Sequence, residues 1–297
     1  MLKDLNILPR IRDSIGYLYV EHCRIDQEAK AITLVDSSGK TAVPCASLSV
    51  LMLGPGTSIT HAAIRVLAET GCLVTWGGEA GVRMYAQGLG DTRSSEKTLH
   101  QARMWADPVT RQNVVYRMYM MRFNEPLEPG LTLRQIRGKE GLRMRAAYSQ
   151  ASRDYGVLWD GRVHGKGNWS STDPINRALS AANSCLYGVC HAAIVSAGYS
   201  TAIGFIHTGR ILSFVYDIAD LYKTQISLPT AFRVVGEGIE NLEQRVRRTC
   251  RDLFFKRRIL QRIVPDINYI LSLHDTKLPQ TQQSSDRNHY SSDMYVY

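Results

Sequence analysis

The segment DPINRALSAANSCLYGVCHAAIVSAGYSTAIGFIHTG, residues 173–209, sets the architecture of this 297-residue chain. Asp173 followed by Pro174 is a typical helix start, with an N-cap carboxylate and a proline in the first turn. From Ala178 to Gly209 the chain carries no Asp, Glu, Lys or Arg, yet its Asn, Ser, His and Gly residues are too polar for a lipid-facing span. We therefore predict a helix over residues 175–197 that is buried inside the protein.

Downstream of about Ser94, apolar residues recur at helical spacing, which predicts further helices. Their predicted ranges are residues 96–106, 109–123, 133–155, 212–223 and 242–271. Residues 157–172 have the composition of an exposed loop or a small hairpin.

Upstream, short apolar and β-branched runs predict strands. One helix is expected among them over residues 61–70, capped by Thr57 or Ser58 and ended by Gly71. The strands are expected over residues 15–22, 31–35, 48–53, 72–76 and 82–86.

Together these patterns predict an α+β protein with two domains. A β-rich N-terminal domain would span residues 1–87, and an all-α helical C-terminal domain would span residues 93–273. Residues 88–92 would link the two domains. The polar residues 274–297 would form a disordered tail.

Composition narrows the class of partner. The chain has 36 Lys and Arg against 27 Asp and Glu, and only nine of those cations are Lys, so Arg dominates a net charge of +9. The planar guanidinium suits phosphate, which favours a polyanionic partner without proving one. Six dispersed cysteines without metal-ligand spacing argue against a disulfide scaffold or structural zinc. The sequence contains no P-loop, Rossmann or nucleophile-elbow motif, and we expect no secretory signal and a cytoplasmic protein.

The segment from His207 to Lys223 contains a candidate metal site. His207 stands where an apolar run gives way to a loop, and Asp217 and Asp220 lie three residues apart on a predicted helix. One imidazole with two carboxylates suits Mg²⁺ or Mn²⁺ better than zinc. The alternative is a solvated helix face on which both aspartates bond to Arg or Lys.

Glu140 is the candidate third ligand, because it is a lone carboxylate among five cations and two glycines in RQIRGKEGLRMR, residues 134–145. A metal-bound acid inside a cationic field is expected when the substrate is a phosphodiester, since the cations hold the phosphates. The alternative is that Glu140 only neutralises its neighbours.

A second basic segment runs from Arg245 to Arg262, with eight cations against Asp252 alone. We expect one helix with a positive face that contacts a nucleic-acid backbone, the alternative being an ordinary exposed face. Tyrosines nearby could stack on bases or hydrogen-bond near the site, or belong to the core: Tyr187, Tyr199, Tyr216 and Tyr222.

Several separated motifs, in order, resemble the CRISPR adaptation integrase family in its type I-E branch. In the N-terminal part they are LGPGTSITHAA from Leu53 and VTWGGEAGVRMY from Val74. In the C-terminal part they are RGKEG from Arg137, NSCLYG from Asn183, and GFIHTG from Gly204 through Tyr216–Asp220. The resemblance runs from near residue 10 to about residue 270.

The resemblance implies that the C-terminal helical domain is catalytic and that the β-rich domain mediates homodimerisation. It implies that Glu140, His207 and Asp220 are catalytic and hold Mg²⁺ or Mn²⁺, with Asp217, Tyr187 and Tyr216 in support. It places His22 where relatives carry an aromatic wedge for the DNA fork, and His164 and Arg210 near the sensor of the DNA end motif. The residues expected near double-stranded DNA are Arg83, Arg137, Lys139, Arg143, Arg210, Lys223, Arg245, Arg247, Arg248 and Arg251.

The implied activity is that of a metal-dependent DNA endonuclease and integrase. The 3′-hydroxyl of a foreign DNA fragment would attack a phosphodiester at a CRISPR repeat, with a small ferredoxin-like second adaptation protein bridging two dimers and no membrane involved. The main alternative is a non-catalytic, Arg-rich nucleic-acid-binding protein whose carboxylates are structural. A third hypothesis is an RNA-processing enzyme.

Overall fold

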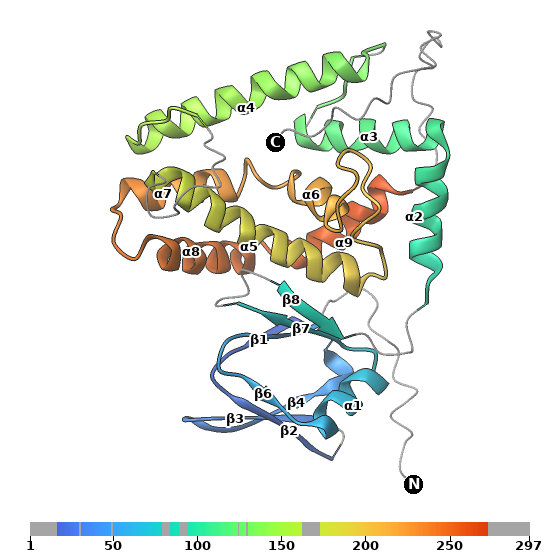
Figure 1. Ribbon diagram of the computed structural model, residues 1–297, viewed down its shortest axis with the longest axis vertical. Coiled ribbons are helices and arrows are strands. Elements are labelled where there is room, and N and C mark those ends of the chain that lie inside the picture. Colours follow the sequence, from blue (N-terminus) through green and yellow to red (C-terminus); the bar gives the residue numbers. More distant parts are fainter. Residues whose placement is uncertain are drawn as a thin grey trace.

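The structure is a computed structural model, and it describes residues 17–29, 31–48, 50–78, 84–88, 94–123, 125–128, 130–161 and 173–272. Its N-terminal part is built of strands and its C-terminal part of helices (Figure 1). The predicted α+β class is therefore confirmed. Residues 162–172 and the tail, 274–297, lie outside the described residues.

Two four-stranded sheets form the N-terminal part, and one helix, α1 (His61–Glu69), packs with them. The first sheet has the order β1-β5-β7-β8, in which β1, β5 and β7 are parallel and β8 is antiparallel to β7. The second sheet has the order β4-β3-β2-β6. Ile25 and Ile32 of the second sheet meet Leu51 of the first and Leu67 of α1 in one buried cluster. In chain order the strands are β1 (Tyr17–Val20), β2 (Arg24–Glu28), β3 (Ala31–Asp36), β4 (Gly39–Pro44), β5 (Val50–Leu53), β6 (Ser58–Ile59), β7 (Leu73–Gly77) and β8 (Met84–Gly88).

The sequence predicted five of these eight strands and missed β2, β4 and the two-residue β6. The residues of β4 are exposed or nearly so, and β2 carries charged residues between its inward-facing ones, so neither shows a long apolar run. The predicted cap of α1 was also wrong. Thr60 caps the helix by accepting a hydrogen bond from the Ala63 amide, because Ser58 is engaged in β6.

Eight helices follow the strands in the part of the chain that the structure describes. They are α2 (Glu96–Ala106), α3 (Pro108–Phe123), α4 (Leu133–Tyr155), α5 (Pro174–Ser196), α6 (Ser213–Ala219), α7 (Ser227–Gly236), α8 (Leu242–Lys256) and α9 (Ile259–Ile270).

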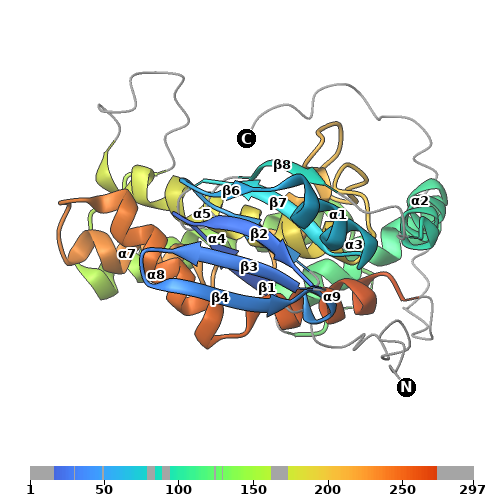
Figure 2. The same cartoon turned by 90° about the horizontal axis from the view of Figure 1, so that it is seen from below.

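The central element is α5, the buried helix predicted from residues 173–209 (Figures 1 and 2). Asp173 caps it, accepting from the Asn176 amide at 2.7 Å, and Pro174 occupies the first turn. Its C-terminal half packs on the first sheet, where Ala192 and Val195 contact residues of β5 and β7. By length and composition α5 could cross a membrane, but 72% of its most apolar window is buried, as in the core helix of a folded domain.

Two helix predictions were wrong. The range 212–223 ends as a helix at Ala219 and continues as turns, and α7, which follows, was not predicted at all. The range 242–271 is two helices, because Arg258 adopts a left-handed conformation with φ of 50°. On either side of that break, Val246 of α8 and Ile263 of α9 are buried in two different hydrophobic clusters.

The core around α5 yields the first test. Leu186 is fully buried in the cluster that contains Phe214 and Ile218, so Leu186→Ala should lower the free energy of unfolding by about 2–5 kcal/mol. Leu142 lies on α4 with 62% of its surface exposed, and Leu142→Ala should change that free energy by less than about 0.5 kcal/mol. Urea denaturation followed by circular dichroism measures both. Equal effects of the two variants would contradict the packing described here.

Candidate active site

Glu140 is placed by α4, the long helix at the upper edge of Figure 1. A capping box starts this helix: Thr132 accepts from the Gln135 amide, and Gln135 accepts from the Thr132 amide. About two helical turns after the capping box, the Glu140 carboxylate accepts hydrogen bonds from Arg143 Nε at 2.8 Å and from Arg143 Nη2 at 3.0 Å. Glu140 therefore neutralises a neighbour on its own helix, as the alternative interpretation held.

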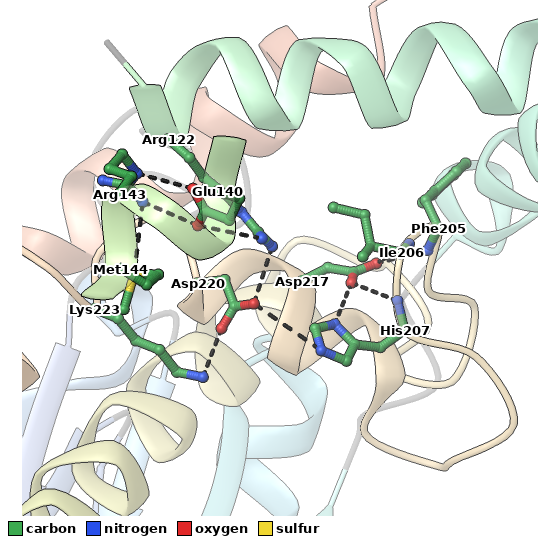
Figure 3. A network of polar contacts seen from close by, with 10 residues as sticks. All are labelled: Arg122, Glu140, Arg143, Met144, Phe205, Ile206, His207, Asp217, Asp220 and Lys223. Carbon is green, nitrogen blue, oxygen red and sulfur yellow. Dashed lines mark hydrogen bonds and ion pairs between the residues drawn. The ribbon is translucent and has the colours of Figure 1, made fainter. Parts of the chain in front are cut away.

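His207 lies in the irregular segment between α5 and α6, and Asp217 of α6 fixes it there (Figure 3). The fully buried Asp217 carboxylate accepts from the amides of Phe205, Ile206 and His207 at 2.6, 3.1 and 2.9 Å. It also lies 2.7 Å from His207 Nδ1. With Nδ1 turned to the carboxylate, the other ring nitrogen, Nε2, is left facing Asp220 at 4.0 Å.

Asp220 comes directly after α6, and its side chain is 16% exposed. Lys223 Nζ lies 2.6 Å from Oδ1, and Arg122 Nη2 lies 3.0 Å from Oδ2. Burial opposes ionisation of this carboxyl, but the charges of Lys223, Arg122 and His207 outweigh it and lower the pKa of Asp220 to about 2. Burial lowers the pKa of Lys223, yet Asp220 and Tyr187 raise it by more. Both groups are therefore charged at neutral pH.

Sequence reasoning missed Arg122, which joins the two carboxylates. It ends α3 with a side chain only 4% exposed, and its Nη1 lies 4.0 Å from Glu140 Oε1 while its Nη2 reaches Asp220 (Figure 3). A signal was available: on the predicted helix over residues 109–123, Arg122 falls four residues after Met118, on an apolar face where an unpaired cation would be costly.

The structure thus places Arg122 between Glu140 and Asp220, with His207 Nε2 facing Asp220, whereas Asp217 contacts the His207 ring at its other nitrogen. The first hypothesis, that Asp217 and Asp220 form a ligand pair, is corrected, because Asp217 already accepts four hydrogen-bond donors. Among the described residues, no three His, Cys, Asp or Glu side chains are grouped closely enough to hold a metal ion as they stand. In the structure, the negative charges of Glu140 and Asp220 are balanced by neighbouring side chains: Arg122, Arg143 and Lys223.

The donor set nevertheless fits a divalent cation chemically. Two carboxylates and one imidazole nitrogen meet there, and the imidazole is oriented by a buried carboxylate, as in many metal sites. Asp220 Oδ1 is buried and accepts no hydrogen bond of good geometry, although Lys223 lies beside it.

Two of the four tyrosines surround this cluster. The ring of Tyr216 lies edge-on to Tyr187 at 5.0 Å and to His207 at 5.9 Å, and Lys223 Nζ lies 5.3 Å from the Tyr187 ring centre. Tyr199 and Tyr222 are core residues, 5% and 1% exposed.

The residues predicted to contact DNA differ in their freedom to do so. Arg137, Arg210, Arg248 and Arg251 are exposed, and Arg251 is paired with Asp252 at 3.0 Å. Others are held by acids or carbonyls: Lys139 by Glu128, Arg143 by Glu140, Lys223 by Asp220, and Arg245 by Glu237 and the Gly238 carbonyl. Arg247 is partly buried on α8. Arg83 and His164 lie outside the described residues.

All six cysteines are buried, and none of them is joined in a disulfide. His22 has a left-handed backbone, with φ of 51°, and lies against the turn at Gly54–Gly56. A side chain at Gly56 would place its Cβ 2.5 Å from His22 Nδ1, so that turn requires glycine.

The protein is of the α+β class, with a strand-rich N-terminal part followed by helices. The helical part carries the candidate site, to which Glu140, His207 and Asp220 belong. Comparison with known proteins gives the family. Residues 117–264 match the family model described as "CRISPR associated protein Cas1". The chain is 56% identical over 265 residues to CRISPR-associated endonuclease Cas1 2 of Thermus thermophilus, covering 89% of this chain and 82% of that protein. This chain therefore belongs to the Cas1 family.

Two further comparisons agree with this assignment. CRISPR-associated endonuclease Cas1 of Escherichia coli is 41% identical over 276 residues, which cover 93% of this chain and 90% of that protein. The crystal structure of a TtCas1–DNA complex matches with a TM-score of 0.81 and 54% identity, covering 90% of this chain and 100% of that chain. A casposase bound to integration product, with a TM-score of 0.51 and 16% identity over 90% of this chain and 99% of that chain, shares the fold.

The arrangement around Asp217 gives a second test. Asp217→Asn replaces one carboxylate oxygen by an NH₂ group, which faces N–H donors, so at least one buried N–H loses its acceptor. Each buried donor left without an acceptor lowers the free energy of unfolding by about 1–3 kcal/mol. We expect a loss of about 2 kcal/mol or more in unfolding free energy, together with a changed NMR signal of the His207 ring. Asp252→Asn, at a 66% exposed side chain, is the control and should do neither. A variant as stable as that control, with an unaltered His207 signal, would refute the positioning role of Asp217.

Proposed function

We propose that this protein is a divalent-cation-dependent DNA endonuclease and integrase that inserts short foreign DNA into a CRISPR array. The observation that carries the proposal is the meeting of Glu140, His207 and Asp220, from three separate segments, around one cationic centre. Membership of a family whose relatives are named CRISPR-associated endonucleases supports the same activity.

Glu140, Asp220 and Nε2 of His207 would hold Mg²⁺ or Mn²⁺. When bound, the ion supplies Lewis-acid stabilisation of the charge that develops on a phosphodiester during displacement. Asp217 keeps the His207 ring in place, and Lys223 keeps Asp220 ionised. Attack by the 3′-hydroxyl of a DNA fragment on a phosphodiester then displaces another 3′-oxygen, whereas attack by water gives cleavage.

Double-stranded DNA is the proposed substrate, as the TtCas1–DNA complex suggests by similarity. The exposed cations of α8, Arg248 and Arg251, lie on one helix and would meet the phosphate backbone. We further propose that the protein is a homodimer formed through the β-rich part, and that a small second adaptation protein bridges two such dimers. The sequence motifs imply that this assembly belongs to a type I-E system and acts in the cytoplasm.

The second candidate function is a non-catalytic DNA-binding protein with structural carboxylates. It is favoured by the ion pairs themselves, since Arg143, Arg122 and Lys223 already neutralise Glu140 and Asp220. Both hypotheses predict DNA binding, so only a test of the chemistry separates them.

Glu140→Gln is that test, because it keeps shape and removes a charge. We expect Mn²⁺-dependent cleavage and strand transfer to fall by about 100-fold or more, since even outer partners of a metal ligand are worth about 10–100-fold. DNA affinity should stay close to wild type, and the variant should still unfold cooperatively, with a melting temperature lowered by the loss of the Arg143 ion pair. Glu128→Gln, at a 72% exposed partner of Lys139, is the control and should keep full activity. Undiminished cleavage by Glu140→Gln would favour the non-catalytic candidate, and the same assays with RNA substrates test the RNA-processing hypothesis.

The basic helix α8 gives a separate prediction. Replacing Arg247, Arg248 and Arg251 together by Ala should weaken DNA binding and reduce the slope of log K against log salt by about 2–3, at about 0.9 per lost phosphate contact. A control triple variant removes three exposed cations of the β-rich part, Arg24, Lys40 and Arg65. Fluorescence anisotropy at salt concentrations from about 50 mM to about 300 mM measures both slopes. Identical slopes in wild type and the α8 variant would remove this helix from the DNA interface.

A further inference from the structure

Arg122 is the most deeply placed cation of the site. Its side chain is 4% exposed, and it reaches two carboxylates that come from different helices, Glu140 of α4 and Asp220 at the end of α6 (Figure 3). Arg143 and Lys223 each touch only one of these acids. Arg122 is thus the residue that ties the two carboxylates to each other.

The Arg122 guanidinium is held by ion pairs rather than by well-aligned hydrogen bonds. Arg122 Nε and Nη2 are buried and make no hydrogen bond of good geometry, even though Nη2 lies 3.0 Å from Asp220 Oδ2. Its Nη1 is 4.0 Å from Glu140 Oε1, and the centre of the Tyr119 ring lies 5.2 Å from Cζ. A buried cation with poor hydrogen bonds gains its stability mainly from the charge opposite it.

Two carboxylates facing each other in a largely buried site repel unless a positive charge lies between them. In this structure the guanidinium supplies that charge at the place where the proposed divalent cation would meet the same oxygens. The guanidinium and the ion therefore compete for Glu140 and Asp220.

We propose that Arg122 is an internal counter-ion that holds Glu140 and Asp220 together in the metal-free protein and is displaced from them when a divalent cation binds. This inference rests on the proposed function, since it requires metal binding at this site. Arg122 is then a positioning residue: it keeps the two acids assembled, and it weakens metal binding by the free energy needed to displace it. The Tyr119 ring remains a cation–π partner for the guanidinium after the carboxylates release it.

Arg122→Met tests the inference in the full-length protein, with MnCl₂ alone as the probe. In EDTA the variant should melt about 5–10 °C below wild type, because a buried carboxylate loses its partner. Its Kd for Mn²⁺, measured by titration calorimetry, should be about tenfold lower than that of wild type, which corresponds to about 1.4 kcal/mol. The melting temperature should therefore rise more on adding MnCl₂ than it does for wild type.

Two control variants separate this role from simpler ones. Arg117→Met removes another buried arginine of α3, one that binds the Ser272 carbonyl, and should destabilise the protein without changing the Mn²⁺ affinity. Arg143→Met removes a cation that touches Glu140 alone, and should change the Kd by less than about threefold. Arg122→Lys keeps the positive charge, so its Kd for Mn²⁺ should stay close to that of wild type and above that of the Met variant. If the Met variant does not fold, the Lys variant is compared with wild type alone.

The outcomes are distinct. Tighter Mn²⁺ binding by Arg122→Met but not by Arg143→Met supports the counter-ion. Equal binding by wild type and Arg122→Met, with both affinities abolished by Glu140→Gln, overturns the counter-ion and leaves the metal-dependent function intact. No Mn²⁺ binding by any of these proteins overturns both.

Discussion

The balance of buried charge in the helical part is the constraint on which the site depends. Asp217 and Asp220 lie one helical turn apart, yet their burial is compensated in two different ways. Asp217 has no cation of its own and is satisfied by three backbone amides and an imidazole. Asp220 is instead satisfied by two cations, Lys223 and Arg122. The first arrangement depends on the geometry of four hydrogen bonds, and the second depends on the charges of two side chains.

This division also explains why the site is assembled from elements far apart in the sequence. The short helix α6 packs on α5, so that its buried face positions Asp217 under the segment that carries His207. The helices α3 and α4 close the other side with Arg122 and Glu140, which meet Asp220 only through the guanidinium (Figure 3). The central helix α5 thus connects the β-rich part, which it touches at Ala192, to the charged cluster, beside which Tyr187 lies.

Local patterns predicted α5 and its cap at Asp173, because both depend on spacing or on a recognisable motif. They could not predict α7, whose Pro229 reads as a helix breaker but is tolerated in the first turn, where the amide has no partner. They also missed the break at Arg258, because apolar residues at helical spacing continue on both sides of that left-handed residue. Arg122 was overlooked for the same reason: its role comes from Glu140 and Asp220, eighteen and ninety-eight positions further along the chain.

The pKa of Asp220 shows which competitor a metal ion would face. Because the folded-state pKa is about 2, below the ordinary value of 3.8, ionisation of this group stabilises the fold above about pH 4, and that contribution is lost as the pH falls towards 2. Protons therefore do not occupy this carboxylate between pH 5 and 8, roughly the range in which proteins are most stable. At neutral pH the groups that hold it are Lys223 and Arg122, and of these only Arg122 also contacts Glu140. A metal ion bound as proposed would therefore compete for this carboxylate with an arginine side chain rather than with a proton.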